Sequence, residues 1–122
     1  QEKLSLNQVN QVAKAYYGHK HAKEIQESYP VFSSTGPLWY RGYFKDPIAQ
    51  KQLNKICNFY DVEHIVVGHT VQTKIKTFYR NKVIAIDTSH KKLLPKNNLQ
   101  AFYKEQEKCY VFYETGEKKL LF

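Results

Sequence analysis

Two residues in this sequence have a type and a setting that could support chemistry, and the first is His69. It follows the apolar run Ile65 to Val67 and is preceded by Gly68, which would let a ligand approach the backbone closely. The ends of buried strands are where α/β folds collect functional groups. A neutral imidazole there could bind a divalent metal ion, whereas a histidine that only caps the strand end is the alternative. Spacing alone does not choose between these interpretations.

The second residue is Arg41, in the run Gly-Pro-Leu-Trp-Tyr-Arg-Gly-Tyr-Phe at 36–44. This run places one arginine among four aromatic residues between glycines, and it fits neither a helix nor an alternating strand. A guanidinium held there could bind a phosphate through two parallel hydrogen bonds. The alternative is packing of Arg41 on Trp39 or Tyr43 by a cation–π attraction of about 0.5–2 kcal/mol. We favour the phosphate-binding interpretation.

Acidic residues are too few for a complete two-metal centre. Such a centre holds its ions about 3.5–4 Å apart and needs several carboxylates and histidines. The chain has three aspartates, and the patterns Asp-x-His, Gly-Asp-x-x-Asp and Gly-Asn-His are absent. Asp87 could orient a ligand, although capping a turn is the more frequent role for such a residue. A self-sufficient centre is therefore not expected, and no catalytic residue is assigned.

Three other histidines and the two cysteines have simpler interpretations. Three histidines stand among polar and lysine residues and are expected at the surface: His19, His21 and His90. Cys57 and Cys109 are far apart and have apolar neighbours, which favours buried thiols over a disulfide between them. Neither cysteine has the motif context of a nucleophile.

The elements that would position these residues are helices first and strands afterwards. A capping box from Ser5 to Gln8 predicts a first helix that ends at Gly18. A second, short helix is expected over 21–27, stopped by Pro30, and a third from an N-cap at Asp46, with Pro47 at the first helical position, to Tyr60. Strands are expected at 65–67, covered on both faces, and then at 73–79, 83–87, 99–104, 109–113 and 118–121, mostly as hairpins.

Composition bounds the protein class. The chain of 122 residues has the size of one domain, and 42% hydrophobic residues are typical of a folded protein. The formal charge of +8 comes almost wholly from scattered lysines, which favours a solvated surface over a nucleic-acid groove. No apolar run approaches the roughly 18 residues of a membrane span, so no membrane partner is expected. We expect a soluble chain, with the compartment open and a cytoplasmic location the default.

Three segments together carry a resemblance to a known family. They are Gly36-Pro37-Leu38-Trp39-Tyr40-Arg41-Gly42-Tyr43, Ile65-Val66-Val67-Gly68-His69-Thr70 and Val83-Ile84-Ala85-Ile86-Asp87-Thr88. Their order resembles the C-terminal part of calcineurin-like metallophosphoesterases, and most of all the bacterial-type (Shewanella-like) serine/threonine protein phosphatases. The sequence departs from the wider superfamily at Val71, where a second histidine is common, and at Ser89, where glycine is common.

The resemblance implies specific roles. His69 would ligate one of two divalent metal ions (Mn, Fe or Zn), and Arg41 would bind the substrate phosphate. The other ligands belong to N-terminal motifs that this sequence lacks, so the chain alone would be metal-free or only partly liganded. The implied fold is α+β, a sandwich of two mixed sheets flanked by helices. Residues 1–122 would form its C-terminal part, with helices and the arginine loop in 1–45, then a helix and a mixed or antiparallel sheet in 46–122.

The function implied is hydrolysis of phosphomonoesters by metal-activated hydroxide, with a phosphorylated protein or small molecule as substrate. The fragment by itself would be inactive. Because an apolar face would be uncovered, we expect it to pair with the missing N-terminal half or with a second copy of itself. The alternative is a non-catalytic basic module, binding nucleic acid or a regulatory partner, on a decayed phosphatase fold.

Overall fold

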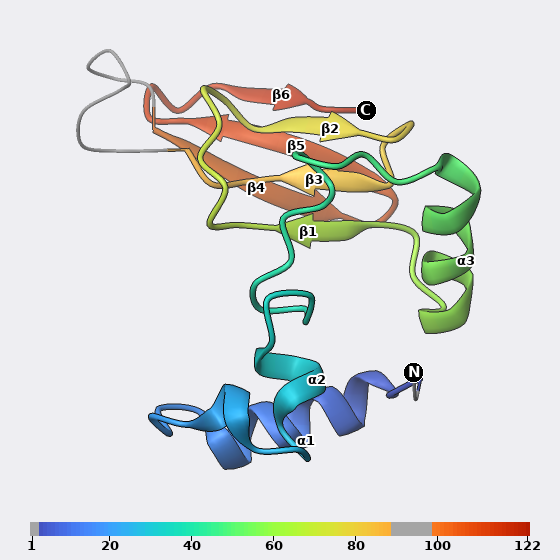
Figure 1. Cartoon of the computed structure of the whole chain (residues 1–122). Coiled ribbons are helices and arrows are strands. Elements are labelled where there is room, and N and C mark those ends of the chain that lie inside the picture. Colours follow the sequence, from blue (N-terminus) through green and yellow to red (C-terminus); the bar gives the residue numbers. More distant parts are fainter. Residues whose placement is uncertain (1–2, 89–98) are drawn as a thin grey trace. The chain divides into compact units, whose positions relative to one another are not determined.

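The computed structural model describes residues 3–88 and 99–122 (Figure 1). It divides into two compact units, Gln1–Ile48 and Ala49–Phe122. The first contains helices and the second contains a helix and two small sheets, so the predicted α+β class is confirmed. Within the described residues, no helix has both the length and the apolar character needed to cross a membrane. The expectations for Ser89 and His90 lie outside the described residues.

Helix α1, Leu6–Tyr16, opens the first unit as the sequence predicts. The Ser5 hydroxyl accepts a hydrogen bond from the Gln8 backbone, and the Gln8 side chain accepts one from the Ser5 backbone. These two bonds satisfy amide groups that a helix start otherwise leaves without partners. The apolar face of α1 is only partly covered, since no residue of the helix is buried. Gly18 follows with a φ of 81°, which turns the chain away from the helix.

The prediction of a second helix over 21–27 that stops at Pro30 is wrong. Instead of a helix over 21–27, the chain forms a short 3-10 turn, Ala22–Glu24, and then α2, Tyr29–Phe32. Pro30 begins α2 rather than ending a helix, because proline is tolerated in a first turn, where its absent N–H would have no partner. The buried Ser28 hydroxyl donates to the carbonyls of Ala22 and Ile25, and these bonds hold the two turns together.

Helix α3, Gln50–Tyr60, starts the second unit. The predicted start at Asp46 and Pro47 is wrong, because Ala49 is the N-cap residue. The predicted apolar face is confirmed at its centre, where Leu53 and Cys57 are buried. The helix ends at Asp61, which adopts the left-handed conformation with a φ of 51°.

A mixed sheet of three strands follows, in the order β1–β3–β2. Strand β1, Ile65–Val67, runs parallel to β3, Val83–Ala85, and β3 is antiparallel to β2, Lys76–Phe78. The predicted hairpin beside the first strand is therefore confirmed. The prediction that β1 is covered on both faces is wrong, since Val66 is 45% exposed.

The turn between β2 and β3 is wound left-handed. Tyr79, Arg80 and Asn81 all have positive φ angles, of 53°, 52° and 67°. The Asn81 side chain accepts a hydrogen bond of 2.8 Å from the Thr77 hydroxyl. The backbone carbonyl of Asn81 lies 2.8 Å from Nδ1 of His64. The turn is thus held from its own hairpin and from the residue that precedes β1.

An antiparallel sheet of three strands completes the unit. Its strands are β4, Gln100–Glu105, β5, Lys108–Tyr113, and β6, Lys118–Leu120, in that order. All three were predicted within one residue at each end. The antiparallel pairing agrees with the hairpins expected from the sequence, but the sequence did not predict that these strands form a second sheet.

The two sheets overlie each other in Figure 1 and share a buried core. Ile75 and Ile84 contribute to it from the mixed sheet, and Cys109 and Val111 contribute from the antiparallel sheet. Both cysteines are free and buried, as predicted, and burial raises the pKa of the Cys109 thiol. The core is therefore that of a small β-sandwich.

Candidate functional site

Arg41 and His69 belong to different compact units, and each has its own local support. Arg41 lies in the first unit, between two tight turns. The amides of Trp39 and Tyr40 donate to the Gly36 carbonyl at 3.0 and 2.9 Å, and those of Phe44 and Lys45 donate to the Arg41 carbonyl at 3.1 and 3.2 Å. The arginine backbone is therefore fixed from both sides by short-range bonds.

The two glycines that bracket this loop are required by close packing. A Cβ atom at Gly36 would lie 2.5 Å from the Val31 carbonyl oxygen and 2.7 Å from that of Pro30. A Cβ at Gly42 would clash with the ring and hydroxyl of Tyr40. The sequence pattern indicated that the glycines were special, and the structure supplies the reason. Backbone atoms of α2 leave no room for a side chain at Gly36, whereas a side chain at Gly42 would have to displace the Tyr40 ring.

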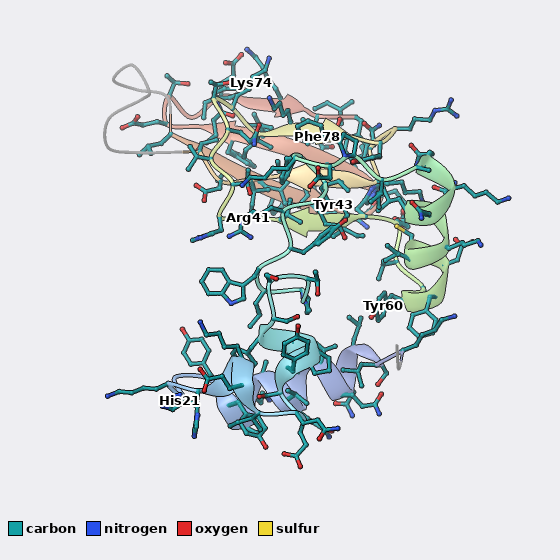
Figure 2. All side chains as sticks on the ribbon, in the orientation of Figure 1. His21, Arg41, Tyr43, Tyr60, Lys74 and Phe78 are labelled. Atoms are coloured by element: carbon teal, nitrogen blue, oxygen red, sulfur yellow. The ribbon has the colours of Figure 1, made fainter. Side chains whose placement is uncertain are left out.

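The Arg41 side chain lies against the aromatic residues of its own loop. Its Cζ atom is 5.9 Å from the centre of the Trp39 ring, and Nη1 donates to the Tyr40 carbonyl at 3.4 Å. Tyr40 and Tyr43 meet edge to face with ring centres 4.9 Å apart. Figure 2 shows Arg41 and Tyr43 on the segment between α2 and α3. The packing alternative is thus present in the structure, and phosphate binding by the same guanidinium stays a prediction.

His69 lies just past the carboxyl end of β1, in the second unit. The residue is exposed, and its φ of 64° is left-handed, an uncommon conformation for a residue other than glycine. Such backbone strain occurs often at functional sites. Gly68 before it is exposed, and no atom lies within 4 Å of a Cβ built there. Close ligand approach at Gly68 therefore stays a prediction.

Parallel pairing brings the residues after β3 to the same edge of the sheet as His69. Val67 lies opposite Ala85, and the Ile86 amide donates to the Val67 carbonyl at 3.0 Å. Just beyond, the Gln72 amide donates to the Asp87 carbonyl at 2.8 Å. The loop that carries His69 is therefore tied to the Asp87 backbone, at the sheet edge where α/β proteins commonly bind ligands.

This edge fits a contribution to a metal site but not a whole one. Imidazole nitrogen and carboxylate oxygen are suitable donors for divalent metals. Among the described residues, however, no group of three or more His, Cys, Asp or Glu side chains is placed to hold an ion. Further ligands would have to come from elsewhere.

Sequence reasoning missed a second polar cluster at the other end of β1. A hollow of about 360 Å³ is lined by Asp61, Val62, Glu63, His64, Val66, Ile84, Phe102 and Lys104. The Lys104 ammonium lies 3.2 Å from the Glu63 carboxylate, and Nε2 of His64 lies 3.9 Å from it. The hydrogen bond from Lys104 holds the pKa of the Glu63 carboxyl below its usual value and raises that of Lys104. Only the run Asp61 to His64 between a helix and a strand could have signalled this cluster.

The fold of this chain is similar to that of phosphatases of known structure. A cold-active protein tyrosine phosphatase has a TM-score of 0.80 and 30% identity to this chain, over 97% of this chain and 35% of the other. The enzyme of that description from a psychrophilic Shewanella species gives a TM-score of 0.81 and 30% identity, with coverages of 98% and 36%. A point mutant of the cold-active enzyme has a TM-score of 0.80 and 30% identity to this chain, over 98% of this chain and 36% of the other.

These similarities support a relation to phosphatases over nearly the whole chain. The chain spans about a third of the length of the phosphatases it matches. No protein-family model matches it, and neither does any curated protein. The predicted phosphatase relation therefore has support, whereas the finer assignment to metallophosphoesterases of the serine/threonine class is not shown, since the similar structures are described as tyrosine phosphatase.

Proposed function

We propose that this chain is part of a metal-dependent phosphatase that hydrolyses phosphomonoesters. The observation that carries the proposal is the similarity to a protein tyrosine phosphatase at 30% identity over 97% of the chain. The description of that enzyme favours a phosphorylated protein as substrate. Because the chain spans only about a third of the similar enzymes, we propose that it is inactive until joined to the remaining part of the domain.

In this proposal Arg41 binds the substrate phosphate. Two glycine-dependent turns hold its backbone, so little freedom is lost when the guanidinium engages an anion. A planar guanidinium matches two phosphate oxygens at once and stabilises the charge that they carry. The cation–π contact with Trp39 orients the side chain before substrate arrives.

His69 would provide one ligand to one of two divalent metal ions. Manganese, iron and zinc are the candidates, because all three accept mixed nitrogen and oxygen donors. The exposed position and the tie between its loop and Asp87 support this role. When bound, the ions supply a strong nucleophile from water at neutral pH and neutralise phosphate charge. The part played by this chain is to place the imidazole at the mouth of the parallel strand pair.

Uncovered apolar side chains support a partner surface. In the first unit they include Leu6 and Tyr17, at the two ends of α1, which are 51% and 85% exposed. Scattered apolar residues are normal on a surface, but α1 has no buried residue at all. We propose that the N-terminal half of the domain covers this surface, and a second copy of the chain is the competing occupant.

The test of the proposed function uses the chain joined to its N-terminal portion. Activity on a generic phosphomonoester with manganese is expected to fall about 100-fold or more in His69→Ala, because a metal ligand is lost. Metal content measured by mass spectrometry should fall in the same variant. His21→Ala removes an exposed histidine of the first unit and serves as the matched control. Full activity and full metal content in His69→Ala would reject the ligand role.

The alternative, a basic module for nucleic acid or a regulatory partner, has less support. Lys104, Lys118 and Lys119 each pair with a glutamate at 3.1–3.2 Å, so their charge is partly neutralised. Retention on nucleic acid that falls steeply with salt and is abolished by Lys→Glu changes would favour the module.

A further inference from the structure

Trp39 stands beside the proposed phosphate-binding arginine and is about half exposed to solvent. Its side chain is 51% exposed, and the neighbouring Leu38 is 46% exposed. A large aromatic residue is costly to leave in water when it could be buried. This exposure lies next to Arg41, whose Cζ atom is 5.9 Å from the indole centre.

The guanidinium and the indole can be reached by one small ligand. An aryl phosphate carries its anion and its ring on either side of a single ester oxygen, so the two groups are close together. At a separation of 5.9 Å between Cζ and the indole centre, the phosphate can bind the guanidinium while the ring packs against the open part of the indole. An alkyl phosphate of a serine or threonine side chain has no ring to make the second contact.

The loop holds this pair in place. The Trp39 amide donates to the Gly36 carbonyl at 3.0 Å, and Gly36 itself is packed against the carbonyls of Val31 and Pro30. On the other side, Tyr40 fills the space above Gly42 and meets Tyr43 edge to face. The indole and the guanidinium are thus presented from a backbone that is fixed on both sides, as a recognition site requires.

We propose that Trp39 determines substrate class in this phosphatase by packing against the ring of an aryl phosphomonoester, such as phosphotyrosine. The inference rests on the proposed function, because it requires Arg41 to bind the phosphate. It adds a residue and a reason for selectivity: the anion supplies affinity for every phosphomonoester, and the indole supplies the preference for aromatic ones.

Inhibition by phosphonates tests the proposal without chemistry at the leaving group. In the complete enzyme, phenylphosphonate is expected to inhibit roughly three- to tenfold more strongly than ethylphosphonate, the range of a typical aromatic pair. Trp39→Leu should remove most of that ratio, and Trp39→Phe should keep most of it. Tyr29→Leu is the matched control, since Tyr29 is 54% exposed in the same unit and should leave the ratio unchanged.

The outcomes separate this inference from the proposed function. If Arg41→Gln weakens both phosphonates but Trp39→Leu leaves the ratio unchanged, the phosphate site stands and the role of Trp39 is overturned. Equal inhibition of the unmodified enzyme by both phosphonates overturns the inference even if Trp39→Leu does not fold. If Arg41→Gln changes neither inhibition nor turnover, the proposed function of Arg41 fails, and the aryl preference fails with it.

Discussion

The arginine loop and the histidine loop are held in place by different kinds of interaction. Around Arg41 the bonds join residues three or four apart, and Gly36 leaves no room for a side chain. Around His69 the support comes from the residues just after β3, through the bonds of Ile86 to Val67 and Gln72 to Asp87, which join distant positions in the chain. Gly68, the glycine of this second loop, has open space around it.

This difference teaches where each functional side chain is vulnerable. The position of Arg41 depends on local packing, so changes within the loop should displace it while distant core changes should not. The position of His69 depends on the sandwich, so core changes beneath the parallel strands should displace it. The two loops can therefore be perturbed separately, and three experiments follow in order of expected effect.

The largest effect is expected from Ile84→Ala. Ile84 is fully buried at the centre of β3 and packs between the two sheets, so its truncation should lower the free energy of unfolding by about 2–5 kcal/mol. Urea denaturation followed by circular dichroism measures this. Val66→Ala, in the neighbouring strand but 45% exposed, is the control and should cost well under half as much. Similar losses in both variants would mean that β1 is covered on both faces after all.

An intermediate effect is expected from glycine replacements in the two loops. Gly36→Ala should destabilise by about 1–3 kcal/mol, because the added methyl group meets backbone carbonyls that cannot move away cheaply. Gly68→Ala should be neutral or slightly stabilising, since it meets nothing and restricts the unfolded chain. Fluorescence of Trp39, the single tryptophan of the chain, reports loosening of the arginine loop directly. Equal sensitivity at the two glycines would contradict the comparison.

The smallest effect concerns the end of β1 opposite His69. The hydrogen bond from Lys104 lowers the pKa of the Glu63 carboxyl in the folded chain, so the pairing stabilises the fold above the ordinary carboxyl pKa and is lost as the pH falls through the lowered pKa. The same hydrogen bond raises the pKa of Lys104, so the contribution is also lost as the pH rises through the raised pKa of the ammonium group.

Lys104→Gln should therefore lower stability slightly between these limits and not at all in strong acid. Thermal unfolding midpoints measured across this pH range, at low and high salt, test the pairing, because salt screens an exposed ion pair. Lys55→Gln, an exposed lysine on α3, is the control. A difference from the unmodified chain that persists unchanged at pH 2 would refute this origin.

Much of the fold could be predicted from the sequence because its signals are local. The capping box at Ser5, the apolar face around Leu53 and Cys57, and the alternating strands near the C-terminus each fixed an element to within a few residues. The errors came where one residue type has two roles. Pro30 was expected to stop a helix and instead lies in the first turn of α2, whereas Pro47 was expected in the first turn of α3 and lies before its N-cap residue, Ala49.

The candidate residues were found by type and neighbourhood, but their surroundings were not. The placement of the Gln72–Asp87 bond next to His69 depends on parallel pairing between distant segments, which no periodicity reveals. The division of six strands into two sheets likewise depends on Ile75, Ile84, Cys109 and Val111 meeting in one core. The close packing of Gly36 against the carbonyls of Val31 and Pro30 likewise becomes known only once the chain is folded.

The left-handed turn from Tyr79 to Asn81 has a consequence for the order of folding. Three successive residues in this conformation disfavour the hairpin by about 1 kcal/mol or more each, so the hairpin should not nucleate by itself. Its carbonyl at Asn81 is bound by His64, seventeen positions earlier in the chain. We therefore expect the hairpin to form only after the segment before β1 contacts it. The slow step in folding of the sandwich would then be this contact between distant segments and not the local turn.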